Sequence, residues 1–200
     1  RTKNSKLAIA CAVTHRTTPA ASIMGSASTT YLDFLARYEG EMGQTVTLEK
    51  FVAFTTSREV GQEHLGSMAE RLVQRSAAKG YASGKQEHTA FLREYWTNTD
   101  VEIEGDAALQ QGMRFNALQL LQSAGRDGLT NIAAKGLSGE HYEGHYFWDT
   151  ETYIIPFFLY SQPGLVRKLL EYRYSILDAA RENAKRMRDQ GALYAWRTIN

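Results

Sequence analysis

Three things are scarce in this 200-residue sequence: cysteine, net charge and long apolar runs. Cys11 is the single cysteine, which excludes an internal disulfide framework and suits a reducing compartment. The 23 Lys and Arg residues nearly balance the 22 Asp and Glu residues, so the net charge is only +1. That balance argues against nucleic acid as a partner, because binding to a phosphate backbone usually needs a basic surface.

No stretch approaches the roughly 20 apolar residues of a membrane span, so we expect no membrane partner and a cytoplasmic location. Residues 1–6 are basic and residues 7–13 apolar, which is the order found in a secretory signal peptide. Residues 14–18, however, are polar and lack a small-residue cleavage pattern. Segment 7–13 is therefore predicted to be a buried strand. The missing initiator Met indicates a piece of a longer protein.

The hydrophobic period changes near residue 60, and this change predicts the fold class. Residues 7–13 and 46–54 alternate with period two, which is typical of strands, and Cys11 is expected to lie in the core of the first one. After residue 60 the apolar residues recur at helical spacing. Strands followed by helices predict a mainly α protein with an N-terminal β portion. The expected helical elements are 63–80, 85–97, 106–125 capped by Asp106, a short helix with Pro156, and a long amphipathic helix over 163–187.

Residues 144–153, GHYFWDTETY, contain the first candidate site. In a structural interpretation, Asp149 caps a helix that begins near Thr150, and Trp148 fills the core. In a functional interpretation, the indole covers the apolar face of a sugar ring while the carboxylate accepts hydrogen bonds from its hydroxyls. The two roles can coexist, since one carboxylate oxygen can cap while the other binds.

Residues 192–198, ALYAWRT, contain the second candidate site, in a predicted loop after the long helix. Trp196 and Arg197 are either a rim aromatic with a solvated cation or the second wall of a pocket. In the second case Arg197 donates hydrogen bonds to sugar hydroxyls.

We expect no metal site in this chain. His141 and His145 have the four-residue spacing of zinc ligands on a helix, but Gly144 interrupts the helix and no third ligand is nearby. The alternating acids of residues 100–106 do not have the spacing of a calcium loop and precede a helix, where solvated acids are common.

Several longer motifs carry a family resemblance. The segments KGLSGE (135–140), GHYFWDTE (144–151) and YRYSILDAARENA (172–184) closely resemble glycoside hydrolase family 65. This is the family of inverting disaccharide phosphorylases that act on maltose, trehalose, kojibiose and nigerose. The resemblance is strong over residues 100–200 and looser over 51–98.

The resemblance implies an architecture in three parts. Residues 1–58 correspond to the end of an N-terminal β-sandwich domain, and residues 59–100 to a helical linker. Residues 101–200 correspond to the first part of an (α/α)6-barrel catalytic domain. The intact enzyme is then expected to be a homodimer.

The resemblance also implies roles for the two candidate sites. Trp148 and Asp149 match residues that hold the non-reducing glucose, and Trp196 and Arg197 match the region that contacts the acceptor sugar. Inorganic phosphate, a co-substrate, attacks the anomeric carbon while a Glu protonates the leaving oxygen. That Glu is expected beyond Asn200, so the chain contains no catalytic residue, and no cofactor is expected.

Two other functions remain open from the sequence. One is a trehalase-like glycoside hydrolase of the same fold, in which a second carboxylate activates water. The other is a non-catalytic saccharide-binding fragment. Among phosphorylases, WRTI (196–199) resembles the trehalose and nigerose types more than the maltose type, whereas Ala195 replaces a Pro that is common in the family.

Overall fold

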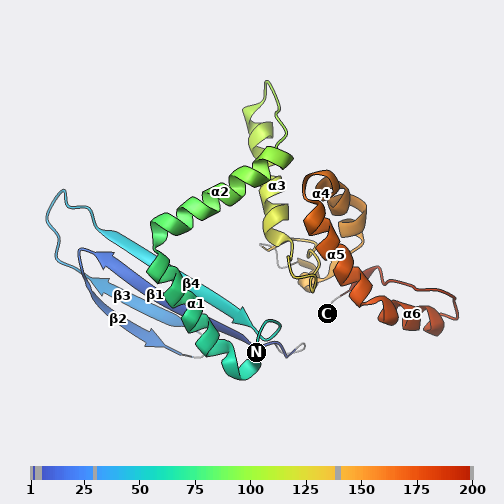
Figure 1. Cartoon of the computed structure of the whole chain (residues 1–200), viewed down its shortest axis with the longest axis horizontal. Coiled ribbons are helices and arrows are strands. Elements are labelled where there is room, and N and C mark those ends of the chain that lie inside the picture. The colour runs from blue at the N-terminus through green and yellow to red at the C-terminus, as the bar shows by residue number, and fades with distance from the viewer. Residues whose placement is uncertain (1, 3–5, 29–30, 138–140, 199–200) are drawn as a thin grey trace. The chain divides into compact units, whose positions relative to one another are not determined.

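The computed structural model describes residues 2, 6–28, 31–137 and 141–198. The chain forms two compact units, residues 1–89 and 90–200. Strands dominate the first part of the chain and helices the second, as Figure 1 shows by the change from blue to green, yellow and red. This order confirms the predicted sequence of strands followed by helices, and the described residues form six α-helices.

The first unit contains two antiparallel ladders. Strand β1 (Ile9–Thr18) pairs with β4 (Thr47–Thr56) along its whole length, and β2 (Ser22–Ala27) pairs with β3 (Leu32–Arg37). The β1–β4 ladder contains both strands that the sequence predicted. The β2–β3 ladder was not predicted.

Helix α1 (Leu65–Lys79) packs against β1 and β4. Its buried residues recur every four positions, which places them on one face of the helix: Leu65, Ala69, Val73 and Ala77. The Thr55 hydroxyl in β4 donates a hydrogen bond of 2.9 Å to the Leu65 carbonyl, so the helix start is fixed to the strand.

The prediction that segment 7–13 is buried on both faces is wrong. The side chain of Ile9 is 57% exposed and Cys11 is exposed as well, although both lie in β1. Helix α1 covers one face of the β1–β4 ladder. The larger residues of the other face, together with Phe34 of β3, line a groove of about 490 Å³ instead.

Helix α2 (Tyr81–Thr99) spans the boundary between the units, and the remaining elements belong to the second unit. In chain order they are α3 (Ala107–Ser123), a 3₁₀ turn (His141–Gly144), β5 (Tyr146–Phe147), a π-helical turn (Thr150–Ile154), α4 (Ile155–Ser161), α5 (Pro163–Ser175), α6 (Leu177–Arg186) and β6 (Arg197–Thr198).

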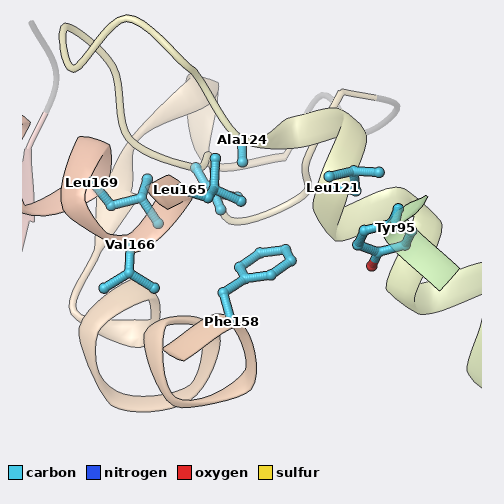
Figure 2. Close-up of a cluster of buried hydrophobic side chains, with 8 residues drawn as sticks. Tyr95, Leu121, Ala124, Phe158, Leu165, Val166 and Leu169 are labelled. Atoms are coloured by element: carbon cyan, nitrogen blue, oxygen red, sulfur yellow. The ribbon is translucent and has the colours of Figure 1, made fainter. Parts of the chain in front are cut away.

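The core of the second unit lies where α2, α3, α4 and α5 meet (Figure 2). Phe158 of α4 and Leu169 of α5 are fully buried there. The Tyr95 hydroxyl on α2 donates to the Ala117 carbonyl on α3 at 2.9 Å, so its one polar atom is satisfied inside an apolar cluster. The cluster comprises Tyr95, Leu121, Ala124, Ile132, Phe158, Leu165, Val166 and Leu169.

Two helix predictions can be compared in detail. The predicted cap is confirmed, because Asp106 accepts hydrogen bonds from the N–H groups of Ala108 and Leu109 at 3.0 and 2.9 Å. The prediction of a single long helix over 163–187 is wrong in one respect. Ile176 leaves helical geometry, with φ −103° and ψ 13°, and divides it into α5 and α6. Among the described residues, no helix combines the length and apolarity needed to cross a membrane.

Candidate functional site

The two segments singled out by the sequence meet in space. Strands β5 and β6 form a short antiparallel ladder in which Tyr146 lies opposite Thr198 and Phe147 opposite Arg197. Trp148 and Asp149 follow β5 directly, Trp196 precedes β6, and Arg197 is the first residue of β6. The sequence predicted residues 191–200 as a loop, and only the β6 residues depart from that prediction among those the structure describes.

Trp148 and Trp196 lie side by side. Their ring centroids are 6.3 Å apart and their planes are inclined by 37°. The Trp148 indole N–H donates to the Ala195 carbonyl at 3.0 Å. Trp148 is 44% exposed and Trp196 is 67% exposed, so the interpretation of Trp148 as a core residue is wrong. Both rings present faces that a ligand could cover.

Asp149 and Arg197 are the two charged candidates, and both are exposed. Asp149 precedes the π-helical turn, yet its side chain accepts no capping hydrogen bond from it. The capping interpretation is therefore wrong for the described chain. Neither Asp149 nor Arg197 forms an ion pair with another residue that the structure describes. Their hydrogen-bonding capacity is available to a ligand.

Burial, a backbone hydrogen bond and an ion pair hold the turn that follows Asp149 in place. It is a π-helical turn, a rare geometry that is frequent at functional sites. Thr150 is 1% exposed, and the Thr152 N–H donates to the Trp148 carbonyl at 2.9 Å. Glu151 forms a two-point ion pair with Arg173 of α5, with Nε–Oε1 at 2.6 Å and Nη2–Oε2 at 2.9 Å.

A cavity of about 300 Å³ is lined by Trp148, Glu151, Leu170, Arg173 and Tyr194. This volume is at the lower end of the range for small-molecule sites. Leu170 and Arg173 of α5 therefore line the candidate site. The sequence analysis did not predict that this helix contributes to it. Glu151 and Arg173 are 22 residues apart, and nothing in their local patterns indicates that they pair.

His141 and His145, which the sequence suggested as possible metal ligands, are not arranged as a zinc site on a helix. Tyr142 and Glu143 have left-handed backbones, with φ 61° and 53°, so His141 and His145 do not share a regular helix. The Nδ1 atom of His145 lies 2.7 Å from the Tyr142 carbonyl. Within the described ranges, no cluster of three or more His, Cys, Asp or Glu side chains could hold a metal ion.

Two of the four acids in residues 100–106, Asp100 and Asp106, have structural partners. Arg114 binds Asp100 through two nitrogens, with Nε–Oδ1 at 2.8 Å and Nη2–Oδ2 at 2.5 Å, and holds the pKa of that carboxyl below its usual value. Asp106 caps α3.

Sequence profiles and relatives point to one family. The profile of the "Glycosyl hydrolase family 65, N-terminal domain" matches residues 1–95, and that of the "Glycosyl hydrolase family 65 central catalytic domain" matches residues 114–200. A putative kojibiose phosphorylase from the human microbiome has a similar structure, with a TM-score of 0.79 and 26% sequence identity over 95% of this chain and 26% of that chain.

Three curated relatives are similar to this chain. The α,α-trehalose phosphorylase of Thermoanaerobacter brockii is 51% identical, covering 81% of this chain and 21% of that protein. The maltose phosphorylase of Bacillus subtilis (strain 168) is 43% identical, covering 74% of this chain and 20% of that protein. The kojibiose phosphorylase of Thermoanaerobacter brockii is 39% identical, covering 88% and 22%. The chain thus spans about a fifth of the length of these relatives, and it belongs to glycosyl hydrolase family 65.

Proposed function

We propose that this chain is part of an inverting phosphorylase that cleaves an α-linked glucose disaccharide with inorganic phosphate. The products are β-glucose 1-phosphate and glucose. The relatives named as trehalose, maltose and kojibiose phosphorylases support this reaction class. Trehalose is the first substrate to test, because two trehalose phosphorylases are 51% and 48% identical to the chain.

The proposed site uses both tryptophans and both exposed charges. Trp148 covers the apolar face of the non-reducing glucose, and Asp149 accepts hydrogen bonds from its hydroxyls. Trp196 and Arg197 contact the acceptor sugar, Arg197 as a donor. One observation carries this assignment: the β5–β6 ladder sets Phe147 opposite Arg197, so the two candidate pairs adjoin.

The proposed chemistry needs one protein acid. A phosphate oxygen forms a bond to the anomeric carbon while the glycosidic C–O bond breaks and a carboxylic acid protonates the leaving oxygen. Glu151 is unsuited to that role, because Arg173 binds both of its carboxylate oxygens. We assign Asp149 to binding only. The acid is expected to be a Glu in the part of the protein beyond Asn200, as are the groups that bind phosphate.

The proposal extends to architecture and assembly. Residues 1–58, 59–100 and 101–200 are assigned to the end of a β-sandwich, a helical linker and the first part of an (α/α)6 barrel. The intact enzyme is proposed to be a cytoplasmic homodimer.

The decisive experiment uses the full-length protein that contains this chain. Purified protein is incubated with trehalose, maltose, kojibiose or nigerose, with and without phosphate, and the sugar phosphate is followed by phosphorus NMR. We expect β-glucose 1-phosphate to form from one of the four disaccharides only when phosphate is present. Release of glucose without phosphate would instead support the trehalase-like hydrolase.

A second experiment concerns the 200-residue chain alone. We expect no turnover of any of these disaccharides, because the proposed acid and phosphate groups lie outside it. Isothermal titration with glucose separates residual sugar binding from none. Phosphorolysis by the isolated chain would overturn the placement of the acid.

A further inference from the structure

Arg173 is an unusual residue in the second unit. It lies on α5 and is only 8% exposed, and no other charged side chain among the residues that the structure describes is as deeply buried. Burying a charge is unfavourable unless the charge is paired and hydrogen-bonded. The environment of Arg173 therefore needs an explanation.

The guanidinium of Arg173 holds the segment that contains Trp148. Two of its nitrogens bind the two carboxylate oxygens of Glu151, at 2.6 and 2.9 Å. Glu151 lies in the π-helical turn, two residues after Asp149 and three after Trp148. Two parallel hydrogen bonds fix both the distance and the plane of a carboxylate, so this pair limits how far the turn can move.

The same residue contacts the segment that contains Trp196. The Tyr194 hydroxyl donates to the Arg173 backbone carbonyl at 3.2 Å, and the guanidinium carbon lies 5.9 Å from the centre of the Tyr194 ring. Tyr194 precedes Ala195, whose carbonyl accepts the hydrogen bond from Trp148. Arg173 thus contacts both segments of the proposed sugar site from one position on α5.

Stability does not account for this arrangement. A buried ion pair often stabilises a fold no more than an apolar pair of similar volume. The Nη1 atom of Arg173 is also buried and has no hydrogen-bond partner within the described part of the chain, which is unfavourable. A two-point ion pair defines the position of the turn relative to α5 more narrowly than an apolar contact would.

We infer that Arg173, acting through Glu151 and Tyr194, is a positioning residue that sets Trp148 and Asp149 relative to Trp196. This inference rests on the proposed function. It adds a residue to which the proposed function gives no contact with sugar or phosphate, and it assigns to the α5 helix the alignment of the two segments that contain Trp148 and Trp196.

The test compares variants of the full-length protein. Arg173→Ala alone leaves Glu151 with an unpaired charge and can unfold the protein, so the informative variant is Glu151→Leu with Arg173→Met. We expect it to melt near the wild-type temperature, while kcat/KM for phosphorolysis falls about 10- to 100-fold through misplacement of the pocket. Arg173→Lys is expected to be intermediate, since a lysine lacks the planar fork.

The matched control is Glu171→Gln. Glu171 lies on the same helix and pairs with Arg167 and Lys168 in a more exposed position. Its substitution should change kcat/KM less than about twofold, because exposed pairs contribute little. A double variant that melts normally and keeps wild-type kcat/KM would overturn the inference.

A second readout does not depend on turnover. Two indoles 6.3 Å apart couple their strong ultraviolet transitions and produce a circular-dichroism couplet, which Trp196→Phe identifies by removing it. The couplet should be lost or inverted in the Glu151→Leu, Arg173→Met variant and kept in Glu171→Gln. If the wild type shows no phosphorolysis while the couplet still depends on Arg173, the proposed function fails and the positioning role stands. An unchanged couplet in the double variant overturns the positioning role.

Discussion

Trp148 donates its indole N–H to the carbonyl of Ala195 at 3.0 Å, across 47 residues of chain. This hydrogen bond ties the two segments that the sequence singled out separately. It also orients the indole, because a single N–H aimed at a fixed carbonyl leaves the ring little freedom to turn. The exposed part of Trp148 therefore has a defined orientation, which the proposed contact with a sugar ring requires.

Substitution of Trp148 should separate the role of the ring from that of its N–H. In the full-length protein, Trp148→Phe keeps an aromatic face and loses the hydrogen bond to Ala195, which contributes about 1 kcal/mol. We expect kcat/KM for the disaccharide to fall about fivefold. Trp148→Ala removes the aromatic face as well and should lower kcat/KM at least about tenfold further than Trp148→Phe does. Steady-state kinetics measures both.

The control for this pair is Tyr160→Ala. Tyr160 lies on α4, is 91% exposed and is a member of neither β5 nor β6. Its loss should leave kcat/KM unchanged. Equal kinetics for Trp148→Ala and wild type would exclude Trp148 from the sugar site.

Asp149→Asn should impair activity without affecting folding. The carboxylate makes no ion pair within the described chain, so the melting temperature should stay within about 2 °C of wild type. A hydrogen bond to a charged group contributes about 1.5–3 kcal/mol, so loss of the charge should lower kcat/KM about 10- to 100-fold. Kinetics and a thermal melt of the same preparation check the two parts. A large drop in melting temperature would instead indicate a structural role.

Local signals in the sequence predicted local structure well. Asp106 caps α3 because a carboxylate just before an apolar helix satisfies free N–H groups, whatever the rest of the chain does. The helical spacing of Leu65, Met68, Leu72 and Val73 likewise predicted a helix over 63–80, where α1 lies, although Leu72 is 39% exposed rather than part of its buried face. Such features depend on neighbours within one or two turns.

Contacts between distant segments left no such signal. The β5–β6 ladder consists of two residues a side, too short for a period-two pattern to emerge. The pairing of Glu151 with Arg173 joins a turn to a helix 22 residues away, and either residue alone resembles an ordinary surface charge. The sequence thus singled out the two pairs of candidate residues but not the contacts from α5 that hold their segments together. The division into residues 1–58, 59–100 and 101–200 stays a prediction.

Removal of the α3 cap should destabilise the second unit locally. Asp106→Ala deprives Ala108 and Leu109 of their acceptor and is expected to lower the free energy of unfolding by about 1 kcal/mol. Amide hydrogen exchange of the first turn of α3 should speed up. Asp178→Ala, which removes an exposed pair with Arg181 in α6, is the matched control and should have an effect below about 0.5 kcal/mol.

His15 should make the stability of the first unit depend on pH. Burial, and secondarily the positive charge of Lys50 opposite it, lower the pKa of His15 from its usual value of 6.5. The unfolded chain therefore takes up a proton at a higher pH than the folded chain does. The contribution of His15 to stability is fully present above pH 6.5 and is lost as the pH falls through the folded pKa.

Urea unfolding at pH 7.5 and pH 5 measures this dependence. His15→Gln cannot titrate, so its midpoint should change less between the two pH values than that of the wild type. Lys50→Gln should also reduce the change, because the folded pKa of His15 moves back toward 6.5 without the facing cation. His88→Gln, at an exposed position on α2, should keep the wild-type dependence. If His15→Gln shows the same pH dependence as the wild type, protonation of other groups governs the acid sensitivity of this unit.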